Sequence, residues 1–296
     1  MAENLKALRR RIRSIGNTMK ITRAMEMVSA AKLRRTQSIL HAGQPYAEKL
    51  QELLQRLAGA AGDSDPLFAR REAGRIAIVV FTGDRGLCGG FNNNLLQMAE
   101  RWIKERGKDN VDVVCMGKKA RDYLGKRGYK ILNAHIDLGG LPEAPLARET
   151  ANELRDCFLA EDYNRVFLLY NCFISQAQYE PVVEQFLPLS PDEISEEGDG
   201  DEQKKGLHAE VEYIYEPDQK QLFARLLPAY LESMMYITLA QSMTAEHSAR
   251  MMAMNNATKN CGELIDSLTL KMNKARQAAI TTEILEVVGG ADALKG

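Results

Sequence analysis

Both ends of the chain carry long helical patterns, and these constrain the fold more than any other feature. In residues 1–37, apolar side chains recur at alternating spacings of three and four, at Leu5, Leu8, Ile12, Ile15 and Met19. Such a heptad seam is typical of a helix that lies along a second helix in a coiled coil. A second helical pattern fills residues 245–294. Helices at opposite ends of one chain can lie along each other only as an antiparallel pair, so the sequence predicts such a pair holding a middle domain at one end.

The first helix is expected to be continuous over most of its length. Beyond Met19 its seam becomes small and mixed. We expect the helix to run through Gly43 and, with a kink, through Pro45, and to end near Leu57. At 1.5 Å per residue, about 55 residues would span roughly 80 Å. The mixed seam positions are Thr22, Met25, Val28 and Ala31.

The second helix is expected to begin at Asp218, to tolerate Pro228 in its first turns and to end at Gly289-Gly290. About 70 residues would span roughly 105 Å, which is longer than one domain needs. Much of this helix should therefore lie against the other terminal helix or against another protein. Its later seam is predicted at Leu264, Leu268, Met272, Ala275, Ala279, Thr282 and Leu285.

Between the helices the pattern alternates between strands and helices. Continuous apolar runs predict buried strands, and the segments between them predict helices that end near Gly107, Gly128 and Ala160. The predicted strands are 75–82, 111–116, 129–136, 164–173 and the stretch before Pro188. This alternation predicts an α/β class with a doubly wound, mostly parallel, Rossmann-like domain.

These patterns predict three parts of the chain. Residues 1–58 and 218–290 are the two coiled-coil helices, and residues 74–217 are the α/β domain. Within it, residues 190–206 are rich in charge and poor in apolar side chains, so we expect a flexible acidic insert. Residues 208–217 alternate between apolar and polar side chains, which predicts an edge strand or hairpin arm.

Composition excludes several classes of protein. Hydrophobic residues make up 45% of the chain and charged residues 27%, as in an ordinary soluble protein. No apolar run approaches the roughly 18 residues of a membrane span, and the N-terminus lacks the apolar core of a signal peptide. The cysteines are odd in number and contain no CxxC pair, so we expect reduced thiols in a cytosolic protein.

Charge is unevenly distributed along the chain. Residues 1–40 contain ten Lys or Arg and two acids, a local net of +8, and residues 190–216 contain ten acids and two lysines, a local net of −8. Such an arrangement suggests an electrostatically oriented partner. A basic helix could also bind nucleic acid, but it lacks interleaved aromatic side chains and its seam is committed to a partner helix.

The segment GDRGLCGGFN (83–92) is the strongest candidate for a phosphate site. It follows a strand and opens a helix, where anions often bind. It is neither GxxxxGK[ST] nor GxGxxG, and it has no Lys, Ser or Thr where a nucleotide and magnesium would need one. A tight turn between strand and helix is therefore the better reading, and a nucleotide site is the alternative.

The other reactive side chains are not spaced as in a catalytic or metal-binding site. Cys88 lies near a helix N-terminus but has no histidine close in sequence, and the four histidines show no metal-ligand spacing. Glu283 and Glu286 share one helix face, which is more often a solvated face than an acid and base pair. We therefore expect no catalytic residue, no metal site and no cofactor in this chain.

Three segments in order carry a resemblance to a known family. They are NTMKITRAMEMVSAAKLRR (17–35), GDRGLCGGFN (83–92) and NKARQAAITTEILEVVGGA (273–291). Together they resemble the gamma subunit of bacterial F-type ATP synthase over the whole chain. The family usually has serine where this chain has Gly83, the acidic insert is longer than in the family's simplest form, and the cysteine pair of the thiol-regulated form is missing.

The resemblance implies a central rotor stalk that couples ion flow through the membrane c ring to ATP synthesis and hydrolysis on the beta subunits. The partners would be the alpha and beta subunits, the epsilon subunit and the c ring, with the complex peripheral to the cytoplasmic face of the bacterial inner membrane. ATP chemistry would take place on beta. The implied contacts with alpha and beta are Met25, Arg250, Arg276, Gln277, Thr281 and Glu283, and those with the c ring are Tyr213, Tyr215 and Glu216.

Three functions can be compared by experiment. A rotor subunit predicts no ATPase activity alone and activity after mixing with alpha and beta. A nucleotide-binding α/β enzyme with helical extensions predicts tight nucleotide binding near residues 83–92. A nucleic-acid adaptor predicts retention on DNA with a steep salt dependence.

Overall fold

The computed structural model describes residues 2–61, 65–71, 74–189 and 218–293. Two compact units make up the chain, one of Met1–Ala30 with Arg250–Gly296 and the other of Ala31–Ala249. We refer to them as the helical unit and the sheet unit. The long helices α1 (Ala2–Ala61) and α6 (Gln219–Ala293) each run through both units. The predicted limits at residues 58, 74 and 217 follow secondary structure instead, and they stay predictions.

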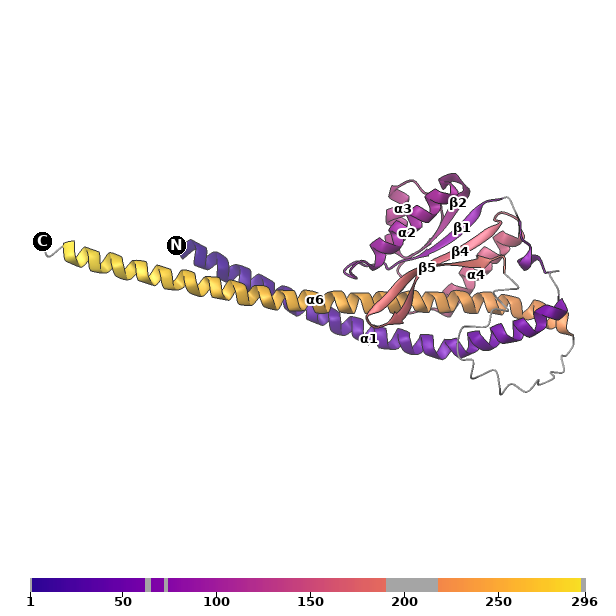
Figure 1. The fold of residues 1–296 in the computed structure, drawn as a ribbon, viewed down its shortest axis with the longest axis horizontal. Helices are drawn as coiled ribbons and strands as arrows, with labels where there is room; N and C mark the ends of the chain where they lie inside the picture. Colours follow the sequence, from indigo (N-terminus) through magenta and orange to yellow (C-terminus); the bar gives the residue numbers. More distant parts are fainter. Residues whose placement is uncertain (1, 62–64, 72–73, 190–217, 294–296) are drawn as a thin grey trace. The chain divides into compact units, whose positions relative to one another are not determined.

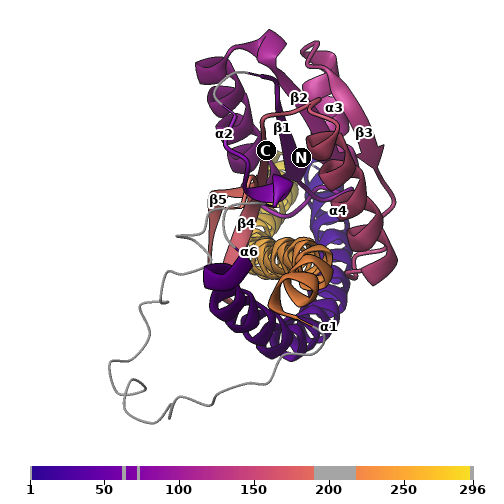
Figure 2. The ribbon, with the colours of Figure 1, turned by 90° about the vertical axis from the view of Figure 1, so that its right-hand side faces the viewer.

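The sheet unit contains the predicted mostly parallel sheet, with strand order β3-β2-β1-β4-β5. The first four strands in chain order run parallel, and β5 returns antiparallel to β4 as a hairpin. Figure 2 shows β3 at one edge of the sheet and β5 at the other. The strands are β1 (Ile76–Phe81), β2 (Val111–Met116), β3 (Ile131–His135), β4 (Arg165–Ser175) and β5 (Gln178–Leu187).

Helices cover both faces of this sheet, as the doubly wound prediction requires (Figure 1). The shorter helices are α2 (Phe91–Arg106), α3 (Lys118–Lys126) and α4 (Ala144–Leu159), with 3-10 turns η2 (Pro66–Phe68) and η3 (Lys108–Asn110). Successive side chains of a strand point to opposite faces. Ile78 and Val80 of β1 therefore face the core under α2 and α3, while Val79 and Phe81 face the core under α4 and α6.

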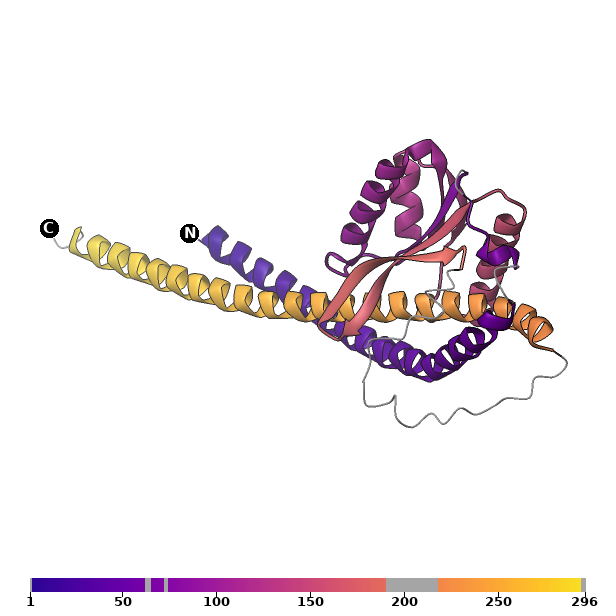
Figure 3. The same cartoon turned by 45° about the vertical axis from the view of Figure 1, so that its right-hand side comes forward.

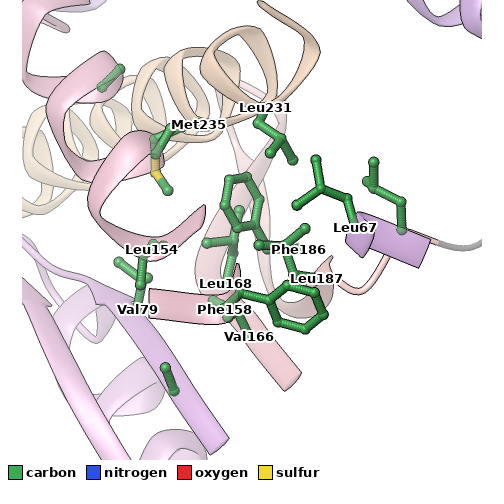
Figure 4. Packing of buried hydrophobic residues seen from close by; sticks show 14 of the residues in the cluster. Leu67, Val79, Leu154, Phe158, Val166, Leu168, Phe186, Leu187, Leu231 and Met235 are labelled. Atoms are coloured by element: carbon green, nitrogen blue, oxygen red, sulfur yellow. The ribbon is translucent and has the colours of Figure 1, made fainter. Parts of the chain in front are cut away.

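The larger core joins the sheet to both long helices within the sheet unit. Figure 4 shows Phe158 of α4 and Phe186 of β5 packed among strand residues, with Leu231 and Met235 of α6 above them. The α6 side chains repeat every fourth residue from Phe223 to Met243, so one stripe of the helix is buried. Leu54 and Leu57 of α1 join the same core. Full burial of each large apolar side chain contributes about 1.5–3 kcal/mol.

The seam of α1 is more regular than the sequence reading predicted. Alternating spacings of three and four continue beyond Met19 to Thr22, Glu26 and Ser29, then through the buried side chains Leu33, Thr36 and Leu40. The predicted seam positions Val28 and Ala31 are wrong, since Val28 is 59% exposed and Ala31 is also exposed. Successive spacings of three rotate a position steadily around the helix and away from the seam.

Two predictions about α6 are corrected for similar physical reasons. Leu264 and Leu285 are 52% and 65% exposed, because each follows from two equal spacings in succession instead of an alternation. The helix also continues through Gly289-Gly290 to Ala293. Glycine weakens a helix by about 1 kcal/mol relative to alanine but permits helical dihedral angles, so two glycines do not have to end it. The insert 190–206 and the segment 208–217 lie outside the described residues.

Candidate functional site

In the helical unit, α1 and α6 are joined by two side-chain hydrogen bonds. The hydroxyls of Thr22 and Thr258 lie 2.8 Å apart, and Asn255 Nδ2 donates to Glu26 Oε1 at 2.8 Å. As the α1 residue number rises, the number of its α6 partner falls, so the predicted antiparallel pairing is confirmed. The same register places the half-buried Ile12 opposite Leu268, which is 8% exposed.

The predicted site residues Met25 and Arg250 both belong to this pair. Met25 is half-buried, and its carbonyl accepts a 2.8 Å hydrogen bond from Ser29 Oγ. Arg250 is 8% exposed. The registers set by Glu26 with Asn255 and by Thr22 with Thr258 place Arg250 about one and a half turns along the pair from Met25. The two positions are therefore neighbours along the helical unit, although they are far apart in sequence.

The predicted residues near the end of α6 lie on its exposed surface. Arg276, Gln277, Thr281 and Glu283 are all exposed. Thr281 Oγ1 donates to the main-chain carbonyl of Gln277 at 2.9 Å, one turn earlier in the same helix. Arg276 and Glu283 are seven residues apart and so share one face of the helix.

Exposed apolar side chains accompany these polar residues, and the sequence reading missed them. On α1, Ile21, Met27 and Val28 are 59–61% exposed. On the last turns of α6 the exposed set is Ile280, Ile284, Leu285, Val287 and Val288. The available signal was that these apolar residues lie off the alternating seam, where a free-standing pair would carry polar residues.

The predicted c-ring contacts Tyr213, Tyr215 and Glu216 lie outside the described residues.

The glycine-rich turn after β1 is tied to α3, the helix that follows β2. The first three amides of α3 all have acceptors in residues 82–84. Lys118 N donates to Asp84 Oδ1 at 2.8 Å, Lys119 N to Gly83 O at 3.2 Å, and Ala120 N to Thr82 Oγ1 at 2.9 Å. The Asp84 carboxylate thus lies where a doubly wound fold could hold a phosphate at a helix N-terminus.

The turn that precedes α2 is held by a side chain of that helix, Asn92. Asn92 Oδ1 accepts from Gly83 N at 2.9 Å, and Asn92 Nδ2 lies 3.3 Å from Arg85 O. Asn92 is 6% exposed, so this turn is folded onto itself. The arrangement favours the tight structural turn over the nucleotide-site alternative, because the first amides of α3 and the amide of Gly83 already have acceptors within the protein.

The described cysteines are not arranged for nucleophilic chemistry. Cys88 is 2% exposed and accepts from Asn92 Nδ2 at 3.0 Å. Burial raises the pKa of Cys115 to about 12, and burial is also the main cause that raises the pKa values of Cys157 and Cys172. A raised pKa leaves a thiol protonated and unreactive at neutral pH.

Within the described part of the chain, no group of three or more His, Cys, Asp or Glu side chains could hold a metal ion. Among the same residues, no helix combines the length and apolar character that crossing a membrane requires. Glu283 and Glu286 are both exposed, in agreement with a solvated helix face.

Known proteins resemble this chain over its full length. The ATP synthase family model matches residues 4–294. The ATP synthase gamma chain of Geotalea uraniireducens is 42% identical over 296 residues, and that of Pelotomaculum thermopropionicum is 43% identical over 293 residues. Each comparison covers 99% of both chains.

Solved structures share the fold at lower identity. A chain of the Euglena gracilis mitochondrial ATP synthase OSCP/F1/c-ring structure is 18% identical with a TM-score of 0.66, covering 99% of this chain and 95% of that one. A chain of the Tetrahymena thermophila mitochondrial ATP synthase central stalk and c-ring gives 22% identity and a TM-score of 0.59, covering 80% and 99%. With full-length bacterial relatives above 40% identity, this chain belongs to the ATP synthase gamma chain family.

Proposed function

We propose that this chain is the central rotor stalk subunit of an F-type ATP synthase. In this role it couples ion flow through a membrane c ring to conformational changes at the beta subunits of an alpha3beta3 hexamer. The proposal rests on family membership and on one structural observation, the exposed apolar side chains of the helical unit.

Those exposed side chains need a partner surface. Ile284, Leu285 and Val287 are 57%, 65% and 72% exposed within a single turn of α6. A helix that ended in water would carry polar residues there. An apolar sleeve formed by surrounding subunits would cover the side chains without fixing one rotational position, because apolar contact has no preferred direction.

The polar contacts follow from the same placement. Met25 and Arg250 contact the alpha and beta subunits near the middle of the chain's helical pair, and Arg276, Gln277, Thr281 and Glu283 contact them near the end of α6. Their positions on the helical unit support this assignment, since the four α6 residues are exposed. Tyr213, Tyr215 and Glu216 contact the c ring, and the epsilon subunit binds beside them.

The subunit itself is non-catalytic, and ATP chemistry takes place on beta. The first amides of α3 and the amide of Gly83 are engaged within the protein, which supports this division of labour. The complex holds the chain peripherally at the cytoplasmic face of the bacterial inner membrane.

Energetics require a stiff element of this kind. One charge that crosses a membrane at about 200 mV yields about 4.6 kcal/mol, so several crossings must be combined for each ATP. A helical pair can store that work elastically and deliver it to beta. Two helices have no threefold symmetry, so three beta sites around them meet different contacts and adopt different populations.

Reconstitution tests the proposal directly. The purified chain is mixed with alpha and beta subunits, ATP hydrolysis is measured, and a bead is attached at an introduced Gln97→Cys. Gln97 is exposed on α2, whereas Cys88 is buried and unsuited to labelling. We expect hydrolysis only in the mixture, with stepwise rotation in one direction. Tight nucleotide binding by the chain alone, without support of hydrolysis, would instead establish the enzyme alternative.

A charge placed at Met25 tests the contact assignment. Met25→Lys puts an ammonium group at a half-buried position where beta approaches the helical unit. We expect less ion pumped per ATP hydrolysed, while hydrolysis persists. Gln97→Lys, which adds the same charge to the exposed surface of α2, is the control. Equal pumping per ATP in the two variants would remove Met25 from the contact set.

A further inference from the structure

The loop after β3 receives hydrogen bonds from both long helices of the sheet unit. Lys32 Nζ of α1 donates to the Gly139 carbonyl at 3.0 Å. His247 Nε2 of α6 lies 2.7 Å from the Gly140 carbonyl. A carbonyl oxygen only accepts, so His247 carries its proton on Nε2 here. The His247 side chain is 3% exposed, so this bond is made away from bulk water. We refer to Lys32, His247 and residues 137–140 as the loop clamp.

The loop is fixed to the sheet as firmly as to the helices. Leu138 N donates to Asp84 Oδ2 at 2.8 Å, and the other oxygen of that carboxylate accepts from Lys118 N at the start of α3. Gly117 N donates to His135 O at 2.7 Å, at the end of β3. One carboxylate therefore ties the loop clamp to the turn after β1 and to the turn after β2.

The clamp requires glycine at position 140. The φ angle of Gly140 is +78°, and a Cβ atom there would lie 2.9 Å from Lys32 Nζ and 3.2 Å from His247 Cε1. Gly139 has a similar φ of +66°, but a Cβ atom there would meet nothing closer than Glu143 Oε1 at 4.0 Å. A side chain at either position would be strained by the positive φ, but only at position 140 would it also displace the helices' donors.

The clamp lies where both helices leave the sheet unit. Lys32 is the second residue of α1 inside that unit, which begins at Ala31, and His247 is two residues before its limit at Ala249. Beside it, Ser248 Oγ donates to Gln176 O in the β4–β5 hairpin, which lies against α6 (Figure 3). The apolar core under α4 reaches α6 only as far as Met243. A small apolar cluster continues beyond Met243 through Ala245 and Ala249, and polar bonds to backbone add to this packing on the last turns of α6 within the unit.

We propose that the loop clamp is the element through which torque passes between the sheet and the two long helices. Apolar packing resists separation but tolerates sliding, whereas hydrogen bonds to a pinned backbone oppose rotation of each helix about its own axis. Because α1 and α6 are held by adjacent carbonyls of one loop, they are held in register with each other. This inference deepens the proposed rotor function and rests on it.

The first experiment measures the clamp in the isolated full chain by amide hydrogen exchange at Leu138 and Gly140. Loss of one hydrogen bond of about 1 kcal/mol raises the open population about fivefold. We therefore expect His247→Leu and Gly140→Ala to speed exchange at these amides by about that factor relative to the wild-type chain. Two matched controls keep the clamp. His247→Gln retains a side-chain donor, and Gly139→Ala adds the same strain without displacing Lys32 or His247.

The second experiment measures coupling in the complex with alpha, beta, epsilon and the c ring, reconstituted in vesicles. ATP hydrolysis and ATP-driven ion uptake are recorded for the same preparations, and subunit content is measured to correct for assembly. We expect Gly140→Ala and the double variant Lys32→Met with His247→Leu to lower uptake per ATP hydrolysed. His247→Gln and Gly139→Ala should match the wild type.

The outcomes separate this inference from the proposed function. Failure of the wild-type chain to assemble or to support hydrolysis would overturn the rotor assignment and the clamp's role together. Faster exchange with unchanged uptake per ATP would overturn the torque role alone, since the clamp would open without a mechanical consequence. Equal ion uptake per ATP hydrolysed in Gly140→Ala and Gly139→Ala would also overturn the torque role. A fall in uptake per ATP confined to the variants that break the clamp supports the proposal.

Discussion

At the scale of single residues, Asp112 is a buried carboxylate that requires hydrogen-bond and ion-pair partners to stay ionised. Its carboxylate is 1% exposed at the start of β2. Lys130 Nζ and the Tyr163 hydroxyl reach Oδ2 at 2.9 and 2.8 Å, and Arg75 pairs with Oδ1. Burial is the largest single influence and raises the pKa of Asp112, but the bonds from Lys130, Tyr163 and Arg75 together lower it below the usual value. The ionised form is therefore the stable one in the folded protein.

Asp112→Asn should destabilise the sheet unit by about 2–4 kcal/mol, because it leaves two cations facing a neutral amide. A carboxyl whose pKa is lowered on folding contributes stability above its unfolded pKa of about 3.9, and that contribution is lost as pH falls through the folded pKa. The variant should therefore show a flatter fall in stability on the acid side, measured by urea unfolding between neutral and acid pH. Asp122→Asn breaks the exposed pair with Arg121 and should change little. If the free energy of unfolding fell equally steeply toward acid pH in the wild type and in Asp112→Asn, this reasoning would be contradicted.

Gly83 offers a second residue-scale test, because a side chain added there would meet Glu246 of α6. A Cβ atom at Gly83 would lie 2.4 Å from Glu246 Oε1 and 2.6 Å from its Cδ. The obstacle is the end of a flexible side chain, so Gly83→Ser should cost about 1 kcal/mol as Glu246 rotates away. Glu246→Ala should remove most of that cost. A double-mutant cycle by thermal or urea unfolding measures the coupling, and additive effects of the two changes would show that Glu246 is not the obstacle.

At the scale of helices and strands, the sequence predicted which helices and strands exist better than it predicted which of their side chains are buried. The strand β1 was expected from a continuous apolar run, since a strand buried on both faces has such a sequence. The predicted α1 seam is correct at Thr22 and fails beyond it, where the buried Ser29 and Thr36 are small and polar. Thr22, Ser29 and Thr36 are 9%, 3% and 0% exposed, so this seam is buried without being apolar. The loop clamp was also missed, because its acceptors are backbone carbonyls that leave no signal in the side-chain pattern.

The threonine pair tests what those polar seam positions contribute. Thr22 and Thr258 each have a carbonyl within hydrogen-bond reach in their own helix, at Met19 and Met254, in addition to each other. Thr22→Val or Thr258→Val should destabilise the helical unit by about 0.5–1 kcal/mol, because the remaining hydroxyl loses its cross-helix partner. The double variant should be nearly neutral, since no hydroxyl is then left unpaired across the seam. Hydrogen exchange of amides near residue 22 measures the stability of the helical unit in the wild type, the two single variants and the double variant. A double variant that loses more stability than the two single variants together would contradict this expectation.

At the scale of the whole chain, stability is unevenly divided between the two units. All three buried apolar clusters lie within residues 31–249. The helical unit instead carries exposed apolar side chains, among them Leu264, Leu270 and Ile280. Sequence patterns could not reveal this division. The heptad spacing identifies the buried side of a helix, but it does not distinguish turns that pack on the core of a domain from turns that pack only on another helix. The unequal burial indicates that the helical unit acquires part of its stability from the subunits around it.

This division predicts different hydrogen-exchange behaviour for the two units. In the isolated chain, amides of residues 5–30 and 250–288 should exchange at least about tenfold faster than those of β1, because a helical pair without a core opens locally at low cost. After assembly with alpha and beta, protection of residues 276–288 should rise while that of β1 stays constant, which makes β1 the internal control. The double variant Gln277→Ala with Thr281→Ala removes polar contacts, and Ile284→Ser with Val287→Ser removes apolar contacts. We expect the first to reduce the increase in amide protection on assembly less than the second does. Protection of the α6 end that is already complete in the isolated chain would show that its apolar side chains need no partner, and the sleeve would lose its physical basis.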